Sequence, residues 1–126
     1  MIETDADVPA GIDAVRAVGT LSRADYDAVV VPMLEAAERE GRRLRILCVV
    51  DEEFRGLTPD GAWADVKLGL TAMHHLEGCA VVSDLGWVRT MSQLAGFFLP
   101  GHVRVFGRAE RDEAVRWLEG LPASGW

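Results

Sequence analysis

Two short apolar runs in the middle of the chain each end at an aspartate. LRILCVV at 44–50 is followed by Asp51, and CAVVS at 79–83 is followed by Asp84. Runs this apolar are typical of buried strands, and the first should be a central strand covered on both faces. The carboxyl ends of parallel strands share one edge of a sheet, where ligands usually bind. We therefore expect Asp51 and Asp84 to lie near each other at that edge.

In the segments around these runs, apolar residues recur at the spacing of a helix. Residues 21–41 predict a helix that starts at a Ser22–Asp25 capping box and ends at Gly41. Pro32 should kink this helix or separate its first turn. Its expected apolar stripe comprises Tyr26, Val29, Val30, Met33, Leu34 and Ala37.

Three further helices are predicted. Within 53–78, Thr58 is the expected N-cap, Pro59 the first helical residue and Gly78 the end. The expected apolar faces are Ala62, Val66, Gly69 and Met73 in this helix, Trp87, Met91, Leu94, Ala95 and Phe98 within 84–101, and Ala114, Trp117, Leu118 and Leu121 in the last helix.

Three more strand-like segments complete the pattern: 1–8, which should pair with 11–19, and 102–106. The resulting order is ββαβαβαβα. Strands that alternate with helices in this way imply right-handed crossovers and a largely parallel sheet. The predicted fold class is α/β, with a mostly parallel, five-stranded mixed sheet and four main helices in a single domain over 1–126.

Charge and hydropathy narrow the range of partners. Thirteen basic and 20 acidic side chains give a net charge of −7, and the basic residues are scattered, which argues against nucleic acid and anionic membrane surfaces. The apolar runs are too short for a membrane span, and the N-terminus does not resemble a signal peptide, so we expect a cytoplasmic protein. Cys48 and Cys79 should be buried free cysteines. No cofactor or metal is expected.

Several spaced stretches resemble the bacterial SpoIIAA-like family across nearly the whole chain. They are PAGIDAVRAVGTLSRADYDAVVVP, DEEFRGLTPDGAWADVKLG, AVVSDLGWVR, PGHVRVF and EAVRWLE. The resemblance implies a compact β-α superhelix related to STAS domains, the fold of anti-sigma-factor antagonists and of cytoplasmic domains of anion transporters. It also implies a more distant relation to SEC14-type lipid carriers.

The resemblance also raises the question of a phosphorylation site. Anti-sigma antagonists carry an aspartate, one or two serines and a glycine after the strand that corresponds to 44–50, and one serine is phosphorylated. This chain has FRGLTPDG there, with Gly56 in the place of the aspartate and Thr58 as the only hydroxyl. The departure favours a helix cap over a regulatory phosphosite at Thr58.

The two aspartates also allow an enzymatic interpretation. Together with Glu52, Glu53 and the nearby His74 and His75, they suggest a metal-dependent or acid-base enzyme. Aspartates after strands, however, commonly cap the following turn. Consecutive histidines on a helix also point about 100° apart, which hinders binding of one ion. Capping is therefore the favoured interpretation.

A rim of aromatic and polar residues suggests binding instead of catalysis. Trp63 and Trp87 each begin a helix after an aspartate-ended strand, so they either pack in the core or line a shallow cleft. The complete predicted rim comprises Asp51, Phe54, Thr58, Trp63, Asp65, Lys67, Asp84 and Trp87. We expect a non-enzymatic binding or regulatory module with a protein partner or a small apolar ligand. The alternative is a lipid carrier resembling SEC14-type domains.

The segment GFFLPG at 96–101 suggests a contact surface. Its three consecutive large apolar residues cannot all face one side of a helix, so at least one should leave the core. Either the helix ends at Phe98 and the loop folds the side chains inward, or Phe97 and Leu99 form an interface. The simplest such interface is a two-fold homodimer, and the other is a docking site for another protein.

Overall fold

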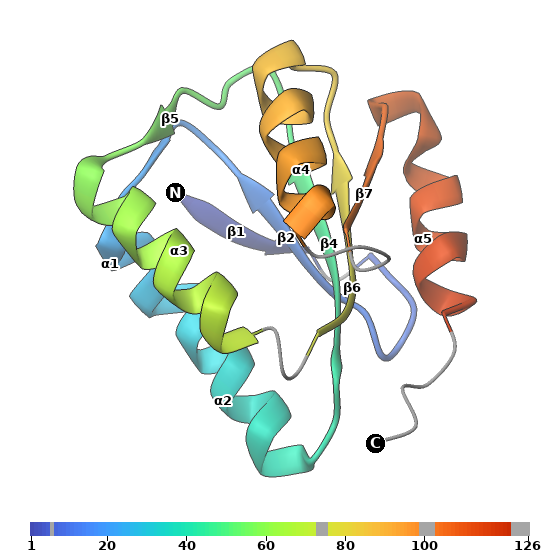
Figure 1. Cartoon of the computed structure of the whole chain (residues 1–126). Helices are drawn as coiled ribbons and strands as arrows, with labels where there is room; N and C mark the ends of the chain where they lie inside the picture. The colour runs from blue at the N-terminus through green and yellow to red at the C-terminus, as the bar shows by residue number, and fades with distance from the viewer. Residues whose placement is uncertain (6, 73–75, 99–102, 122–126) are drawn as a thin grey trace.

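The computed structural model describes residues 1–5, 7–72, 76–98 and 103–121, with side chains except at 69–72 and 95–98. Within these residues, five strands form the main sheet in the order β1-β2-β4-β6-β7 (Figure 1). They are β1 (Ile2–Asp5), β2 (Asp13–Ala17), β4 (Leu44–Val50), β6 (Leu76–Val82) and β7 (Val103–Phe106). β1 is antiparallel to β2 and the other pairs are parallel. The predicted mixed sheet is confirmed, with β4 at its centre.

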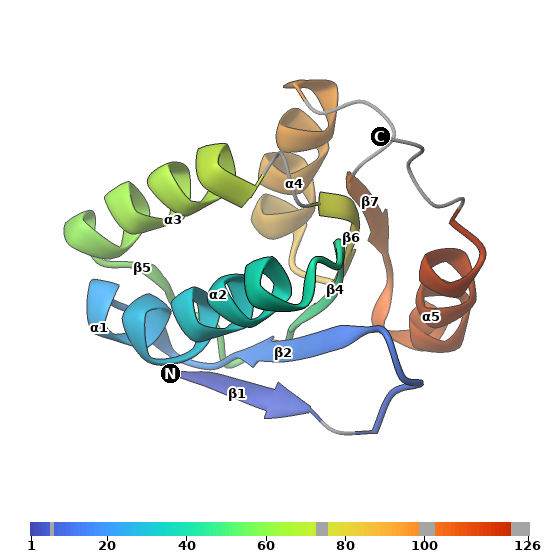
Figure 2. The ribbon, with the colours of Figure 1, turned by 90° about the horizontal axis from the view of Figure 1, so that it is seen from below.

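Helices cover both faces of this sheet. They are α1 (Arg23–Asp25), the π-helix η1 (Tyr26–Val30), α2 (Val31–Glu40), α3 (Pro59–Ala72), α4 (Gly86–Phe98), the 3₁₀-helix η2 (Arg108–Glu110) and α5 (Arg111–Glu119). α2, α3 and α4 lie on one face and α5 lies on the other (Figure 2). We call these the three-helix face and the α5 face. A small parallel sheet of β3 (Thr20–Leu21) and β5 (Gly56–Leu57) was not predicted.

The first helical segment shows how Pro32 is accommodated. Asp25 accepts hydrogen bonds from the Ser22 backbone N–H (2.8 Å) and hydroxyl (3.1 Å), as the capping box predicts. A proline at the start of α2 has no N–H to donate, and the turn before it widens into η1, where the Val31 N–H bonds to the Tyr26 carbonyl. Gly41 ends the helix in the left-handed conformation, at φ 65°.

Strand alternation divides the core between the two faces. On the α5 face, Leu47 of β4 and Leu118 of α5 are fully buried. On the three-helix face, Tyr26 and Val50 belong to a second cluster. Burying each large apolar side chain stabilises the fold by about 1.5–3 kcal/mol. The apolar positions predicted for the first and last helices are confirmed.

The predicted end of α3 at Gly78 is wrong. Gly78 lies inside β6 opposite Arg45, next to a register shift at Leu44/Arg45. A Cβ atom on Gly78 would come within 2.4 Å of the Leu121 side chain. The glycine therefore allows close packing after α5, and its role could not be told from a helix terminus by local sequence.

The predicted apolar face of α3 is also wrong where it is described. Ala62 and Val66 are exposed, whereas Ala64 and Leu68 pack against the core. The reason is that α3 rests on α1, η1 and β5. The burial of Gly69 is not among the features described, and Met73 lies outside the described residues.

The predicted core stripe of α4 faces solvent. Trp87, Met91 and Leu94 are 49%, 62% and 53% exposed, whereas Val88 is buried. Arg89 is also turned inward and donates to the Ser83 carbonyl (2.9 Å). Helical spacing shows which residues share a face, but it does not show which face meets the core. The side chains of Ala95 and Phe98 are not among those described.

Candidate functional site

Asp51 and Asp84 occupy the predicted edge of the sheet. β4 and β6 are neighbouring parallel strands, with Val49 opposite Val82 near their carboxyl ends. Asp51 follows β4 directly, and Asp84 stands two residues after the end of β6. The expected placement at adjacent strand ends is confirmed, and the partners of each carboxylate indicate what it does there.

Asp51 is a buried carboxylate held by an arginine. Asp51 is 5% exposed, and its Oδ2 accepts hydrogen bonds from Arg16 Nε (2.8 Å) and Nη2. Its Oδ1 accepts the Glu53 N–H (3.1 Å), which closes the turn after β4. Burial alone would raise the pKa of Asp51, but the hydrogen bonds from Arg16 and Glu53 outweigh it and hold the pKa below its ordinary value.

Asp84 caps a distant turn instead of its own. Its Oδ1 accepts the backbone N–H of Arg108 (3.0 Å), at the start of η2. The turn after β6 is closed by Ser83, whose hydroxyl accepts the Leu85 N–H (3.1 Å). Both aspartates therefore accept backbone N–H groups, as capping predicts, but only Asp51 caps the turn that follows its strand.

Thr58 has the geometry of a helix cap. Its Oγ1 accepts the Gly61 N–H (3.0 Å) and donates to the Asp60 carboxylate. The cap and the first helical position of Pro59 are as predicted. The hydroxyl is engaged in holding the first turn of α3.

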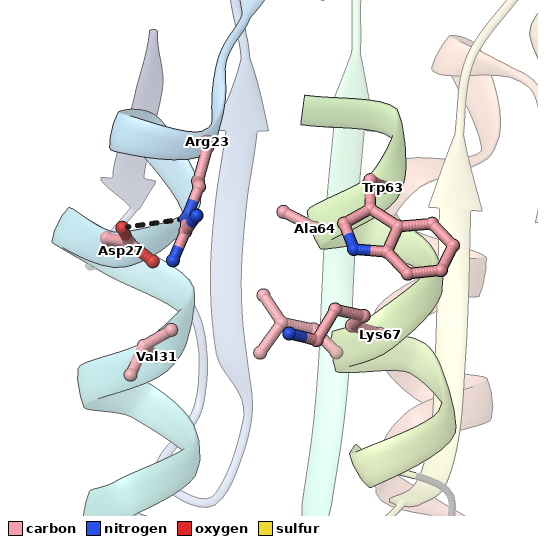
Figure 3. Close-up of a pocket in the computed structure, with 7 residues that line it drawn as sticks. Arg23, Asp27, Val31, Trp63, Ala64 and Lys67 are labelled. Atoms are coloured by element: carbon pink, nitrogen blue, oxygen red, sulfur yellow. Dashed lines mark ion pairs between the residues drawn. The ribbon is translucent and has the colours of Figure 1, made fainter. Parts of the chain in front are cut away.

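Trp87 and Trp63 belong to separate features. Trp87 stacks on Phe54, with ring centroids 5.4 Å apart and an interplanar angle of 16°. Trp63 is 66% exposed and lines a groove between α3 and the α1–α2 segment (Figure 3). The groove has a volume of about 130 Å³ and is lined by Arg23, Asp27, Val31, Trp63, Ala64, Lys67 and Leu68. Lys67 joins Trp63 there as expected, but Trp87 does not.

Asp65 forms a polar contact between α3 and η1. The Tyr26 hydroxyl donates to its Oδ1 (3.1 Å). Surrounding protein atoms raise the pKa of the Asp65 carboxyl more than the hydrogen bond from Tyr26 lowers it, although the residue as a whole is solvent-exposed. Asp65 therefore supports the packing of α3 on η1 instead of lining the groove.

The sheet separates the predicted rim into two groups. Val49 and Asp51 point to the α5 face because strand side chains alternate, whereas Val50 belongs to the three-helix face. Phe54 packs against the three-helix cluster. The aspartates and the tryptophans therefore do not form one site, and sequence proximity to the strand ends could not reveal this division.

A cavity on the α5 face contains arginines that the sequence analysis missed. It has a volume of about 330 Å³ and is lined by Asp5, Arg16, Val49, Asp51, Val82, Arg108 and Arg111. Arg16 interrupts the apolar residues of β2 on the face that it shares with Ala14. This alternation along β2 could have pointed to Arg16 from the sequence. Arg108 and Arg111, however, reach the cavity from a different part of the chain.

The cysteines and the remaining predicted residues add no further site. Cys48 and Cys79 are free thiols, and burial raises the pKa of Cys48 to about 12 and that of Cys79 higher still. Within the described ranges, no three His, Cys, Asp or Glu side chains form a group suited to a metal ion. None of the described helices is long and apolar enough to cross a membrane. His74, His75 and Leu99 lie outside the described residues, as does the side chain of Phe97 in α4.

Comparison with known proteins agrees with this fold. The model of the SpoIIAA-like family matches residues 12–119, and the chain belongs to that family. A solved structure of an uncharacterised DUF3478-family protein with a SpoIIAA-like fold, from Shewanella loihica PV-4, is similar to this chain. The TM-score is 0.74 and the sequence identity is 28%, with 93% of each chain covered. No curated protein matches the sequence. The resemblance and the fold class predicted from the sequence are confirmed.

Proposed function

We propose that this chain is a non-enzymatic, cytoplasmic binding or regulatory module that acts through protein–protein contacts on α4. The observation that carries the proposal is the outward apolar stripe of that helix. Trp87, Met91 and Leu94 follow one another at i, i+4 and i+7, and Phe54 stacks on Trp87. We call these four residues the α4 stripe.

The composition of the α4 stripe suits a protein interface. Aromatic residues and methionine are enriched in the centres of such interfaces. Burying a large apolar side chain contributes about 1.5–3 kcal/mol, and this gain is forfeited while the stripe faces water. Exposed apolar patches on soluble proteins commonly mark interaction sites.

A second copy of this chain is the proposed occupant. The chain carries a net charge of −7, so two copies repel each other over most of their surfaces. Arg89 is the only charged residue between Gly86 and Phe98, and its guanidinium bonds inward to Ser83. Two α4 stripes can therefore meet about a two-fold axis without bringing like charges close together. Phe97 and Leu99 are the interface residues predicted from the sequence, and Leu99 and the side chain of Phe97 lie outside the described residues.

Light scattering as a function of concentration tests the proposal. Wild-type protein should show the mass of a dimer, and Met91→Ser should shift the mass toward the monomer with an unchanged circular dichroism spectrum. Phe97→Ser, at the interface position predicted from the sequence, should do the same. Val66→Ser is a matched control, because Val66 is a similarly exposed apolar residue (53%) on α3. A wild-type monomer at high concentration, or equal effects of Met91→Ser and Val66→Ser, would contradict the contact between copies.

The two alternative functions receive less support from the site geometry. The groove beside Trp63, at about 130 Å³, is smaller than the roughly 300–1,000 Å³ of typical small-molecule sites, which argues against a lipid carrier using it. Asp51 and Asp84 each bind protein donors, which favours structural roles over acid-base catalysis. A protein partner of another kind remains the other outcome of the α4 experiment.

A further inference from the structure

The cavity on the α5 face gathers positive charge from three segments that are distant in sequence. Arg16 comes from β2, Arg108 from η2 and Arg111 from α5. Val49 of β4 and Val82 of β6, which are paired in the sheet, add an apolar surface to the cavity lining. Strand order brings these residues together, so no local sequence motif specifies the cavity.

Two of the three guanidinium groups are already anchored by carboxylates. Arg16 bonds to Asp51, and Arg111 Nη2 donates to Asp5 Oδ2 (2.9 Å). Each guanidinium has five N–H donors, so both residues are held in place while retaining donors for a ligand. The anchoring lowers the entropic cost of ordering these side chains when a ligand binds.

Arg108 differs from the other two. Its backbone N–H is fixed by Asp84 (3.0 Å), and within the described part of the chain its guanidinium bonds directly to no carboxylate, although its charge contributes to the lowered pKa of Asp51. Three guanidinium groups and two carboxylates line the cavity, and the Glu3 carboxylate lies 3.9 Å from Arg16 Nη1 beside it. The lining itself carries one net positive charge, and its guanidinium donors, those of Arg108 above all, are complementary to an anion.

The donor geometry favours a phosphate over a carboxylate. Guanidinium groups recognise both anions through paired N–H donors. Donors that approach from three separate elements suit the three terminal oxygens of a phosphate monoester, whereas a carboxylate offers only two oxygens. At about 330 Å³, the cavity lies at the lower end of the range for small-molecule sites.

We propose that this cavity binds a small organic phosphate. Arg108 provides the cation to which no carboxylate bonds directly, Arg16 and Arg111 provide further donors, and Val49 and Val82 contact the apolar part of the ligand. The site is independent of the α4 stripe because the two lie on opposite faces of the sheet. A monomeric wild-type protein would therefore leave this inference standing.

Phenyl phosphate is the probe for the first experiment. Titrated into ¹⁵N-labelled protein, it should give saturable shifts that include the amides of Asp51, Arg108 and Arg111. Isothermal titration calorimetry should show binding that weakens as ionic strength increases. Inorganic phosphate tests how much the apolar ring contributes, and benzoate tests the preference for phosphate. Both should bind more weakly than phenyl phosphate.

Arg108→Gln is the decisive variant. It should weaken phenyl phosphate binding by about tenfold or more, the loss expected for hydrogen bonds to a charged group. Its melting temperature without ligand should stay close to that of the wild type, because the side chain loses no direct bond to a carboxylate and only its longer-range attraction to Asp51. Arg39→Gln, on an exposed position of α2, removes the same charge away from the cavity and should leave binding unchanged.

Three results would overturn the inference. They are the absence of saturable binding, shifts spread over the surface instead of the cavity, and equal weakening by Arg108→Gln and Arg39→Gln. Tighter binding of benzoate than of phenyl phosphate would also contradict the assignment to phosphates. Loss of binding in Arg108→Gln with unchanged melting temperature is the result that supports it.

Discussion

Arg16 on β2 and Asp51 after β4 form an ion pair in which the partners differ in exposure. The Asp51 side chain is 7% exposed, and the Arg16 side chain is 42% exposed. Arg16 offsets much of the desolvation cost of burying the Asp51 carboxylate, whereas Arg16 itself retains contact with solvent. The pair also joins two neighbouring strands of the main sheet.

Replacing Asp51 should therefore destabilise the fold more than replacing Asp84. Asp51→Asn removes the buried carboxylate that Arg16 binds and leaves only the exposed Glu3, 3.9 Å from Arg16 Nη1, so it should lower the free energy of unfolding by about 1–3 kcal/mol, less than for a fully buried pair. Asp84→Asn alters one cap and should cost about 1 kcal/mol or less. Urea denaturation measures both values. A larger loss for Asp84→Asn than for Asp51→Asn would contradict this assignment.

The same ion pair predicts part of the acid sensitivity. The folded state lowers the pKa of Asp51, so its ionised form contributes stability that is fully present above the unfolded pKa of about 3.9. That contribution is lost as the pH falls through the lower folded pKa. Urea midpoints measured between about pH 6 and pH 3 should fall less steeply for Asp51→Asn than for the wild type. Glu35→Gln, at an exposed position of α2, should follow the wild type.

Asp65 predicts the opposite pH dependence. Its pKa is raised in the folded state, so its contribution to stability should fall as the pH rises from the unfolded value of about 3.9 through the folded pKa. Asp65→Asn keeps an oxygen that can accept the Tyr26 hydroxyl and should raise the melting temperature at pH 7. The difference should shrink toward pH 4. A lower melting temperature at pH 7 would show that the charged contact is stabilising.

Gly61 should be intolerant of even a methyl group. A Cβ atom there would come within 2.5 Å of the Leu21 carbonyl oxygen, a backbone atom that cannot turn away. Gly61→Ala should lower the free energy of unfolding by about 1–2 kcal/mol, because overlap outweighs the gain of about 1 kcal/mol in helix propensity. Gly86→Ala is the control, since no neighbouring atom lies within 4 Å of its Cβ position. It should leave stability unchanged or slightly increased in the same denaturation experiment.

The amino-acid sequence by itself determined the order of the main strands and helices and several of their ends. The apolar runs before Asp51 and Asp84 define the two central strands, and Ser22, Gly41 and Thr58 set helix termini through hydrogen bonds or backbone conformations that involve a few neighbouring residues. The residues that make such interactions lie within one or two helical turns of each other in the sequence. The same pattern also placed both aspartates at one edge of the sheet.

Only the tertiary structure decided which surfaces are covered and which residues meet. The spacing of Trp87, Met91 and Leu94 is the same whether that stripe faces the core or solvent, and the packing of Val88 and Arg89 turns it outward. Likewise, strand order brings Arg16, Arg108 and Arg111 to one cavity, and the sheet separates it from the tryptophans. These relationships join residues up to 95 positions apart, from Arg16 to Arg111, and no local interaction specifies them.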